Sequence, residues 1–293
     1  MNRGASGMNG CPMPLWPDPG MTASLTPYLL SGVRPAILVI PGGGYGCVCM
    51  DSEGEPVARR FNELGYHAFV LNYRVAPHRF PAPQQDAVRA MRTIRRNAEA
   101  WGVIRDRVAV CGFSAGAHLA GCLGTIPKSI PDVLNDAVDA ENGVPDGMIL
   151  SYGVLCFEPW SHEGSIRNLL GPDPDPELLK RCSLEKQADG DTVPAFIWHT
   201  AADQMVAFRN SVDFAAAMAA HGRPFELHLF PFGRHGMLLG LGTRDVGRWP
   251  EAACAFLETQ WRYREEGASM LEHYTNEYQC RMELEQNGGD IPR

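Results

Sequence analysis

The chain alternates between short, nearly continuous apolar runs and longer segments in which apolar residues return at helical spacing. The apolar runs are rich in β-branched residues, which is typical of strands covered on both faces of a sheet. On this pattern we expect strands at residues 35–41, 67–74, 108–114, 147–153, 195–201 and 225–231.

Helical segments lie between these strands. Residues 84–102 carry an apolar face opposite an arginine-rich face, and Gly102 is expected to end that helix. We expect two further helices at residues 211–222 and 250–266, with Pro250 in the first turn of the latter. Strands that alternate with helices form βαβ units with right-handed crossovers. The pattern therefore predicts one α/β domain, a mostly parallel, twisted sheet with helices on both faces.

Three segments fall outside this alternation. Residues 155–192 join two expected strands, and a connection this long in a compact domain usually has a function. We interpret it as a lid or a pocket wall; the alternative is a solvent-facing excursion with a short helix near residues 176–181. We expect an N-terminal extension over residues 1–25, the domain over 26–261, and a polar tail over 262–293 that prolongs the last helix and frays.

Composition narrows the class of protein. The 293 residues are 45% hydrophobic and 20% charged, which suits one large core. The formal net charge of -8 and the lack of a basic run argue against nucleic-acid or anionic-membrane partners. No apolar run reaches the length of a membrane span, and the N-terminus does not resemble a signal peptide, so we expect a cytoplasmic protein.

The cysteines support the same interpretation. Their number, 9, is odd, and they are scattered, which predicts free and mostly buried thiols in a reducing compartment rather than a disulfide framework. Cys47 and Cys49 lack the spacing of a zinc knuckle and no second pair accompanies them. We therefore expect no metal site.

The stretch GFSAG at residues 112–116 fits the pattern G-x-S-x-G between an expected strand and an expected helix. A chain that turns this sharply strains the serine backbone, and the flanking glycines remove Cβ atoms that would clash. Ser114 would then project beyond the carboxyl edge of the sheet, with the Ala115 N–H as one donor to an oxyanion. The alternative is an ordinary glycine-rich turn.

A second glycine-rich stretch, PGGGYG at residues 41–46, directly follows the first expected strand. Its backbone N–H groups can approach a small anion without interference from side chains. A phosphate cradle is the rival interpretation, but the stretch lacks the Gly-Lys-Ser/Thr continuation and the G-x-G-x-x-G spacing. We expect Gly43 and Gly44 to donate to an oxyanion.

Asp203 and His235 each follow an expected strand at the same edge of the sheet. The chain order Ser114, Asp203, His235 is the order of nucleophile, acid and base in the α/β-hydrolases. We expect these residues to form a catalytic triad. The rival base is His162 in the long connection, and the rival acid is Asp245, which we interpret instead as a cap or ion-pair partner of the last helix.

These motifs, together with NYRVAPHRFPAPQQDAVRAM at residues 72–91 and GSIRNLLG at 164–171, resemble the esterase/lipase group of α/β-hydrolases over residues 26–257. Within that group the chain is similar to acetyl esterases and acetyl-xylan-esterase-like proteins. Ala117 and Ala207 stand where such relatives often carry glycine and proline. The short N-terminus implies that the first strands of the family's full sheet are reduced.

The resemblance implies a serine carboxylic-ester hydrolase that needs no cofactor. It would remove short acyl groups, acetyl above all, from a small-molecule or oligosaccharide ester such as a plant-polysaccharide fragment. The alternatives are a peptidase or amidase on the same fold and a non-catalytic binding protein on this scaffold. The sequence does not predict the oligomeric state.

Several side chains have both a substrate-binding and a structural interpretation. The aromatic residues Tyr45, Phe157 and Trp160 are candidates for a carbohydrate site, although aromatics at loop ends more often pack. Glu53 and Glu55 are candidates for contacts to sugar hydroxyls. We prefer to interpret both as the charged first turn of a helix, which the helix dipole favours.

Overall fold

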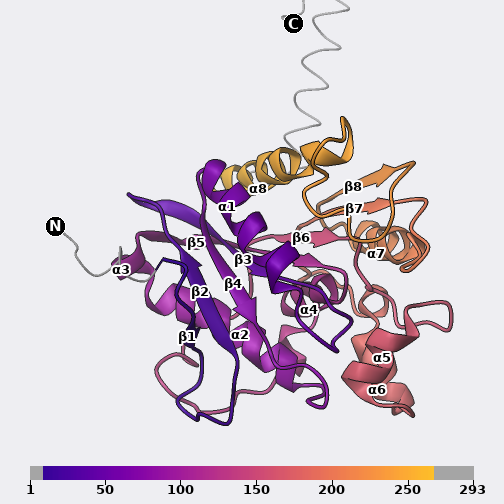
Figure 1. The fold of residues 1–293 in the computed structure, drawn as a ribbon, viewed down its shortest axis with the longest axis horizontal. Coiled ribbons are helices and arrows are strands. Elements are labelled where there is room, and N and C mark those ends of the chain that lie inside the picture. The colour runs from indigo at the N-terminus through magenta and orange to yellow at the C-terminus, as the bar shows by residue number, and fades with distance from the viewer. Residues whose placement is uncertain (1–8, 267–293) are drawn as a thin grey trace, which may run out of the picture.

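The computed structural model describes residues 9–266. Its centre is an 8-stranded sheet in the order β1-β2-β4-β3-β5-β6-β7-β8 (Figure 1). β1 and β2 pair antiparallel with their neighbours, and every other pairing is parallel. The strands are β1 (Met13–Pro14), β2 (Ser24–Tyr28), β3 (Arg34–Ile40), β4 (His67–Asn72), β5 (Val103–Phe113), β6 (Met148–Ser151), β7 (Ala195–Thr200) and β8 (Phe225–Phe230).

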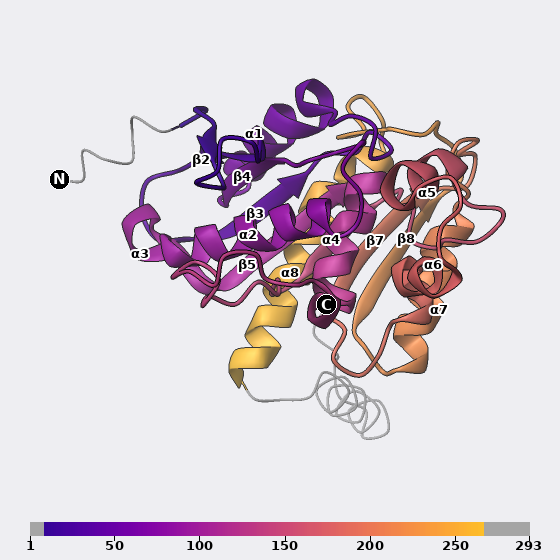
Figure 2. The same ribbon diagram turned by 90° about the horizontal axis from the view of Figure 1, so that it is seen from below.

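Helices cover both faces of this sheet, as the sequence pattern predicts (Figures 1 and 2). One core cluster joins a face of the sheet to α1 (Glu55–Glu63) and α8 (Trp249–Glu266). The other cluster joins the opposite face to α2 (Ala82–Arg96), α3 (Ala98–Trp101), α4 (Ala115–Thr125) and α7 (Arg209–Ala220). The remaining helices are α5 (Glu163–Leu170), α6 (Pro176–Cys182) and short turns at Met50–Gly54, Pro127–Ser129, Leu184–Lys186 and Val246–Arg248.

The strands and helices expected from the sequence are confirmed, with small shifts at their ends. β5 differs most, because it begins at Val103 rather than at residue 108. The helix expected over residues 84–102 is divided at Asn97 into α2 and α3, and Gly102 ends it in the left-handed conformation with φ 70°.

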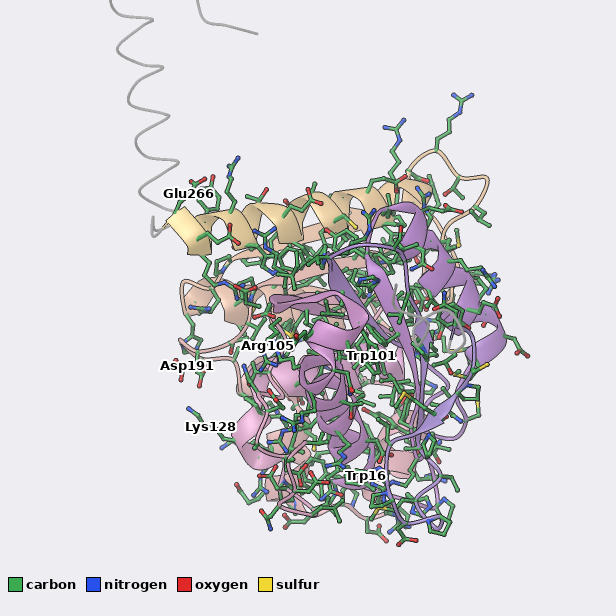
Figure 3. The ribbon with its side chains drawn as sticks, turned by 90° about the vertical axis from the view of Figure 1, so that its left-hand side faces the viewer. Trp16, Trp101, Arg105, Lys128, Asp191 and Glu266 are labelled. Atoms are coloured by element: carbon green, nitrogen blue, oxygen red, sulfur yellow. The ribbon has the colours of Figure 1, made fainter. Side chains whose placement is uncertain are left out.

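The extension expected over residues 1–25 is wrong for its described part. β2 begins at Ser24, and Leu15 and Trp16 are buried in the core. The Trp16 indole N–H donates to Asp86 over 2.6 Å, and the Arg89 guanidinium lies 5.1 Å from its ring centre. Figure 3 labels Trp16 on the side of the molecule away from the end of α8. The domain therefore starts well before residue 26. β1 has only 2 residues.

At the other end, α8 continues past residue 261 to Glu266. The Arg264 side chain donates to Asp146 over 2.9 Å, so the start of the expected tail packs on the domain. The rest of the tail expected over residues 262–293 lies outside the described residues. On the same side of the molecule, Lys128 and Asp191 form an ion pair of 3.3 Å (Figure 3).

The cysteines of the described region are free, and most of them are buried, as predicted; Cys280 lies outside it. Over residues 9–266, no helix is both long and apolar enough to cross a membrane. In the same range no cluster of three or more His, Cys, Asp or Glu side chains is arranged to hold a metal ion.

Candidate active site

Ser114 occupies a strained turn between β5 and α4. Its backbone has φ 53° and ψ -117°, a conformation that residues with a Cβ rarely adopt. A Cβ on Gly112 would lie 2.2 Å from the Gly116 carbonyl oxygen, and one on Gly116 would lie 2.2 Å from the Ile40 carbonyl oxygen. Glycines at these two positions therefore let the chain turn within the space between β3, β5 and α4.

The structure brings Ser114, His235 and Asp203 together at the carboxyl edge of the sheet. His235 Nε2 lies 3.0 Å from Ser114 Oγ, and His235 Nδ1 lies 2.7 Å from Asp203 Oδ2. Because a carboxylate can only accept, Nδ1 carries the proton and Nε2 is left free to accept one from the serine. The geometry is that of a nucleophile, a general base and an orienting acid.

Asp203 is held as an ionised acceptor. Its side chain is fully buried, and Oδ1 accepts from the backbone N–H groups of Met205 (2.8 Å) and Val206 (3.0 Å). Burial alone would raise the pKa of Asp203, but hydrogen bonds from His199 and His235 outweigh it and hold that pKa well below its usual value.

His199 was not among the residues predicted for the site. Its Nε2 lies 3.3 Å from Asp203 Oδ2 and 3.0 Å from the Val206 carbonyl oxygen, while Nδ1 bonds the Ser211 hydroxyl over 2.8 Å. The signal in the sequence is its position at the end of the strand that precedes Asp203. A strand-end histidine so close to the acid is well placed to buttress it.

The loop that follows β3 supplies unpaired backbone donors next to Ser114. Over residues 9–266, the N–H groups of Gly43, Gly44 and Ala115 donate to no protein acceptor. Gly43 has φ 127°, and a Cβ there would lie 2.2 Å from the Cys47 carbonyl oxygen, so the close loop needs a glycine. A Cβ on Gly42 would lie 3.0 Å from Ser114 Cβ. The expected oxyanion donors thus belong to segments that adjoin the serine.

Side chains from several elements hold this loop in place. The Tyr45 hydroxyl donates to His118 Nδ1 over 2.7 Å, and the Tyr73 hydroxyl donates to the Pro41 carbonyl over 2.9 Å. Asn168, on α5, donates to the Gly44 carbonyl over 2.9 Å. The Gly42 N–H donates to Glu53 over 2.6 Å. Sequence reasoning found none of these contacts, because the partners are distant along the chain.

The two rival residues have other roles. His162 Nδ1 accepts from the Ser165 N–H over 3.2 Å at the start of α5, and its ring lies against Gly44. Burial, followed by the neighbouring His235, lowers the pKa of His162. Asp245 accepts from the Val246 N–H over 2.7 Å and caps the short helical turn before α8, which matches the capping role expected for it.

The long connection packs beside the site. α5 and α6 lie near α7 at the β8 side of the sheet (Figures 1 and 2). Through Asn168 and His162, α5 contacts the glycine loop, so the connection forms a wall there. The short helix near residues 176–181, which belonged to the alternative interpretation, is present as α6, whereas α5 was not predicted.

For the side chains that had both a substrate-binding and a structural interpretation, the structure gives their exposure and contacts. Tyr45 and Phe157 are buried, with exposed fractions of 0% and 2%, so they pack rather than line a binding site. Trp160 is partly exposed, and the Arg209 guanidinium lies 4.7 Å from its ring centre. Glu55 is an exposed helix residue paired with Arg59, as interpreted.

Glu53 lies in the first turn of the helical segment Met50–Gly54, as interpreted, but its side chain is buried. Only 5% of the residue is exposed. Its carboxylate accepts hydrogen bonds from the Gly42 N–H and the Tyr152 hydroxyl.

The order of the strands and the serine turn at their carboxyl edge define an α/β-hydrolase. The family model described as BD-FAE matches residues 26–218, more than half of the chain, and the chain belongs to this family.

Among solved structures, the chain is similar to the acetyl ester-xyloside bifunctional hydrolase from Caldicellulosiruptor lactoaceticus. The TM-score is 0.78 and the identity 38%, over 88% of this chain and 97% of that one.

Two curated relatives match a large part of the chain. Endo-1,4-beta-xylanase B of Butyrivibrio fibrisolvens is 41% identical over 210 residues, which is 70% of this chain and 32% of that protein. The acetylxylan esterase of Xylanibacter ruminicola is 30% identical over 229 residues, 73% of this chain and 45% of that protein. The chain thus spans less than half the length of either relative.

Proposed function

We propose that the protein is a serine carboxylic-ester hydrolase that removes short acyl groups, acetyl above all, from carbohydrate esters. The observation that carries the proposal is the chain of hydrogen bonds from Asp203 through His235 to Ser114, which stands at a strained turn. The family and the names of the similar proteins support an ester as the substrate.

In the proposed mechanism, Ser114 Oγ attacks the ester carbonyl carbon while His235 Nε2 takes the hydroxyl proton. The carbonyl oxygen becomes an oxyanion, for which the unpaired N–H groups of Gly43, Gly44 and Ala115 are the donors. When the tetrahedral intermediate collapses, the carbon–oxygen bond to the leaving group breaks and His235 protonates the departing alkoxide.

The acyl-enzyme is then hydrolysed by the same groups. His235 takes a proton from water, which attacks the acyl carbon, and the proton returns to Ser114 Oγ as the acid leaves. Asp203 keeps the imidazole in the productive tautomer and stabilises its cation. No step calls for a group other than these side chains, backbone donors and water.

The proposal that the alcohol part of the substrate is a carbohydrate rests on two observations. Similar proteins are named for acetylxylan and acetyl ester-xyloside, and Trp160 is partly exposed. Sugar rings stack on aromatic faces of this kind. A cytoplasmic location and small-molecule or oligosaccharide esters as substrates belong to the same proposal.

Trapping of the serine tests the mechanism. A fluorophosphonate should add its phosphonyl group to Ser114, located by peptide mass spectrometry, and abolish hydrolysis of p-nitrophenyl acetate. Ser114→Ala should lower kcat by about four orders of magnitude or more while the protein stays folded. Label on another residue, or near wild-type turnover by the folded variant, would overturn the mechanism. Matched ester and amide substrates then separate an esterase from an amidase.

A further inference from the structure

Glu53 is a buried carboxyl group that the proposed mechanism does not use. It lies in the helical turn Met50–Gly54 that precedes α1, and only 5% of it is exposed. Both of its oxygens are occupied, Oε2 by the Gly42 N–H (2.6 Å) and Oε1 by the Tyr152 hydroxyl (2.9 Å). Since both neighbours donate, the group acts here purely as an acceptor, the role of a carboxylate.

The first hydrogen bond of Glu53, from the Gly42 N–H, connects it to the backbone donors of the glycine loop. Gly42 immediately precedes Gly43 and Gly44 and packs against Ser114. Once the Gly42 N–H is committed to Glu53, the orientation of the next peptide units is restricted. The N–H groups of Gly43 and Gly44 stay without a protein acceptor over the described residues, as an oxyanion site requires.

The second hydrogen bond of Glu53, from Tyr152, connects it to the general base His235. Tyr152 follows β6 with φ 39°, an unfavourable conformation for a residue with a Cβ, and is only 2% exposed. Its ring lies 5.1 Å from the His235 ring, with an angle of 74° between their planes. The bond to Glu53 fixes the outer end of this ring, so one carboxyl group contacts both the loop and the wall behind His235.

The electrostatic setting agrees with this placement. Burial raises the pKa of Glu53 above its usual value and outweighs the hydrogen bonds from Gly42 and Tyr152 and the nearby His235, which act to lower it. A carboxylate close to His235 also favours the imidazolium that forms as the serine loses its proton.

We infer that Glu53 is a positioning residue, which orients the oxyanion donors through Gly42 and the general base through Tyr152. The inference rests on the proposed function, because it assigns the glycine loop and His235 their roles in ester hydrolysis. It concerns transition-state geometry, so ground-state binding of the substrate should be nearly unaffected.

The test compares Glu53→Gln with Glu55→Gln in the full-length protein. Glu55 is two positions away but exposed and paired with Arg59, so its variant is the matched control. With p-nitrophenyl acetate, Glu53→Gln should lower kcat and kcat/KM together by about 10- to 100-fold, with KM within about threefold. Glu55→Gln should match the wild type.

A transition-state probe excludes a merely structural effect. Phenylboronic acid forms a tetrahedral adduct with an active-site serine, and one of its oxygens takes the place of the oxyanion. The inhibition constant of phenylboronic acid should rise in Glu53→Gln by about the same factor as kcat/KM falls. Wild-type kcat in Glu53→Gln, or lowered kcat/KM with unchanged boronate affinity, overturns the inference.

A second variant covers the case in which Glu53→Gln fails to fold. Tyr152→Phe keeps the ring beside His235 and removes only the hydroxyl bonded to Glu53. It should lower kcat about 3- to 10-fold, again without a change in KM; no effect on kcat counts against the inference. If Ser114→Ala keeps its activity, the proposed function itself fails. If Ser114→Ala is inactive and Glu53→Gln is not impaired, only the role of Glu53 fails.

Discussion

Glu53 and Glu55 are two positions apart, yet one is buried beside the glycine loop and the other is exposed. Their positions relative to the next helix explain this difference in burial. Glu53 precedes the buried Val57 by four residues, which places it on the inward face of the helical segment, whereas Glu55 is paired on the outer face with Arg59. A carboxylate on an apolar face needs buried donors, and these come from residues far away in the sequence.

A substitution of Asp203 tests its proposed role as the acid that orients His235. Asp203→Asn should lower kcat by about 10⁴-fold with little change in KM, because the amide no longer favours the imidazole tautomer that presents an acceptor to Ser114. Steady-state kinetics on p-nitrophenyl acetate measure both constants. Asp245→Asn, which alters only a helix cap, is the control, and a larger loss in that variant would assign the acid to Asp245.

At the scale of elements, the sequence was sufficient where one local pattern dominated. The parallel strands are continuous apolar runs, and the turns after β3, β5, β7 and β8 carry the predicted site residues. β2 was missed because it is a short strand with Pro27 inside it, and α5 because its short segment lies in a polar, proline-rich connection. Both elements are stabilised by packing rather than by their own sequence pattern.

His118 shows how such elements are joined. This residue of α4 accepts from the Tyr45 hydroxyl in the glycine loop and donates through Nε2 to the Cys182 carbonyl at the end of α6. Its ring stacks on Phe157 at 4.4 Å. The neutral imidazole satisfies both partners, whereas a proton on Nδ1 would place a second buried charge-bearing N–H against the tyrosine hydroxyl, which would then have to accept instead of donate.

The pH dependence of stability tests this junction. Burial lowers the pKa of His118 to about 4 from 6.5, so between these values the unfolded chain binds the proton that the folded protein does not. The free energy of unfolding should therefore fall by about 3 kcal/mol from this group as pH drops from 6.5 to 4, and no further below that. Urea unfolding at several pH values measures it.

His118→Asn, which keeps polar atoms but cannot titrate, should lose this pH-dependent component whatever its overall stability. An equal slope in the wild type and the variant would mean that another group causes the dependence. His67 and His162, whose pKa values are also lowered by burial, are the alternative sources.

At the scale of the whole molecule, a parallel sheet explains why residues so far apart in the sequence meet. The loops after β3, β5, β7 and β8 leave the same edge, and they carry the oxyanion donors, nucleophile, acid and base. This convergence was predictable from the expected parallel arrangement of the strands. The supporting contacts, such as Glu53 to Gly42, depend on side-chain packing that no local pattern encodes.

The architecture also limits the acyl group. The wall formed by residues 155–192 buries most of its leucines: Leu155, Leu169 and Leu184 are 0% exposed, and Leu178 and Leu179 are partly buried against the core. Over the described residues, none of the large exposed hydrophobic side chains belongs to this wall. A lipase needs an apolar lid or channel, because each buried CH₂ contributes about 0.8 kcal/mol to binding. This wall offers no such surface, so the gain should be absent beyond the first carbons of the acyl chain.

Specificity constants should therefore fall from acetyl or propionyl to octanoyl esters by at least about tenfold, equivalent to about 1.4 kcal/mol of transition-state stabilisation. The measurement is kcat/KM for p-nitrophenyl esters of two to eight carbons, each below its micelle concentration. A variant with leucine in place of the partly exposed Trp160 serves as a comparison, because it alters the wall without touching the triad. It should retain the preference for short acyl groups on these aryl esters and lose activity selectively on acetylated xylo-oligosaccharides. A profile that rises steadily to eight carbons would mean a deep apolar channel, and the protein would then be a lipase rather than an acetyl esterase.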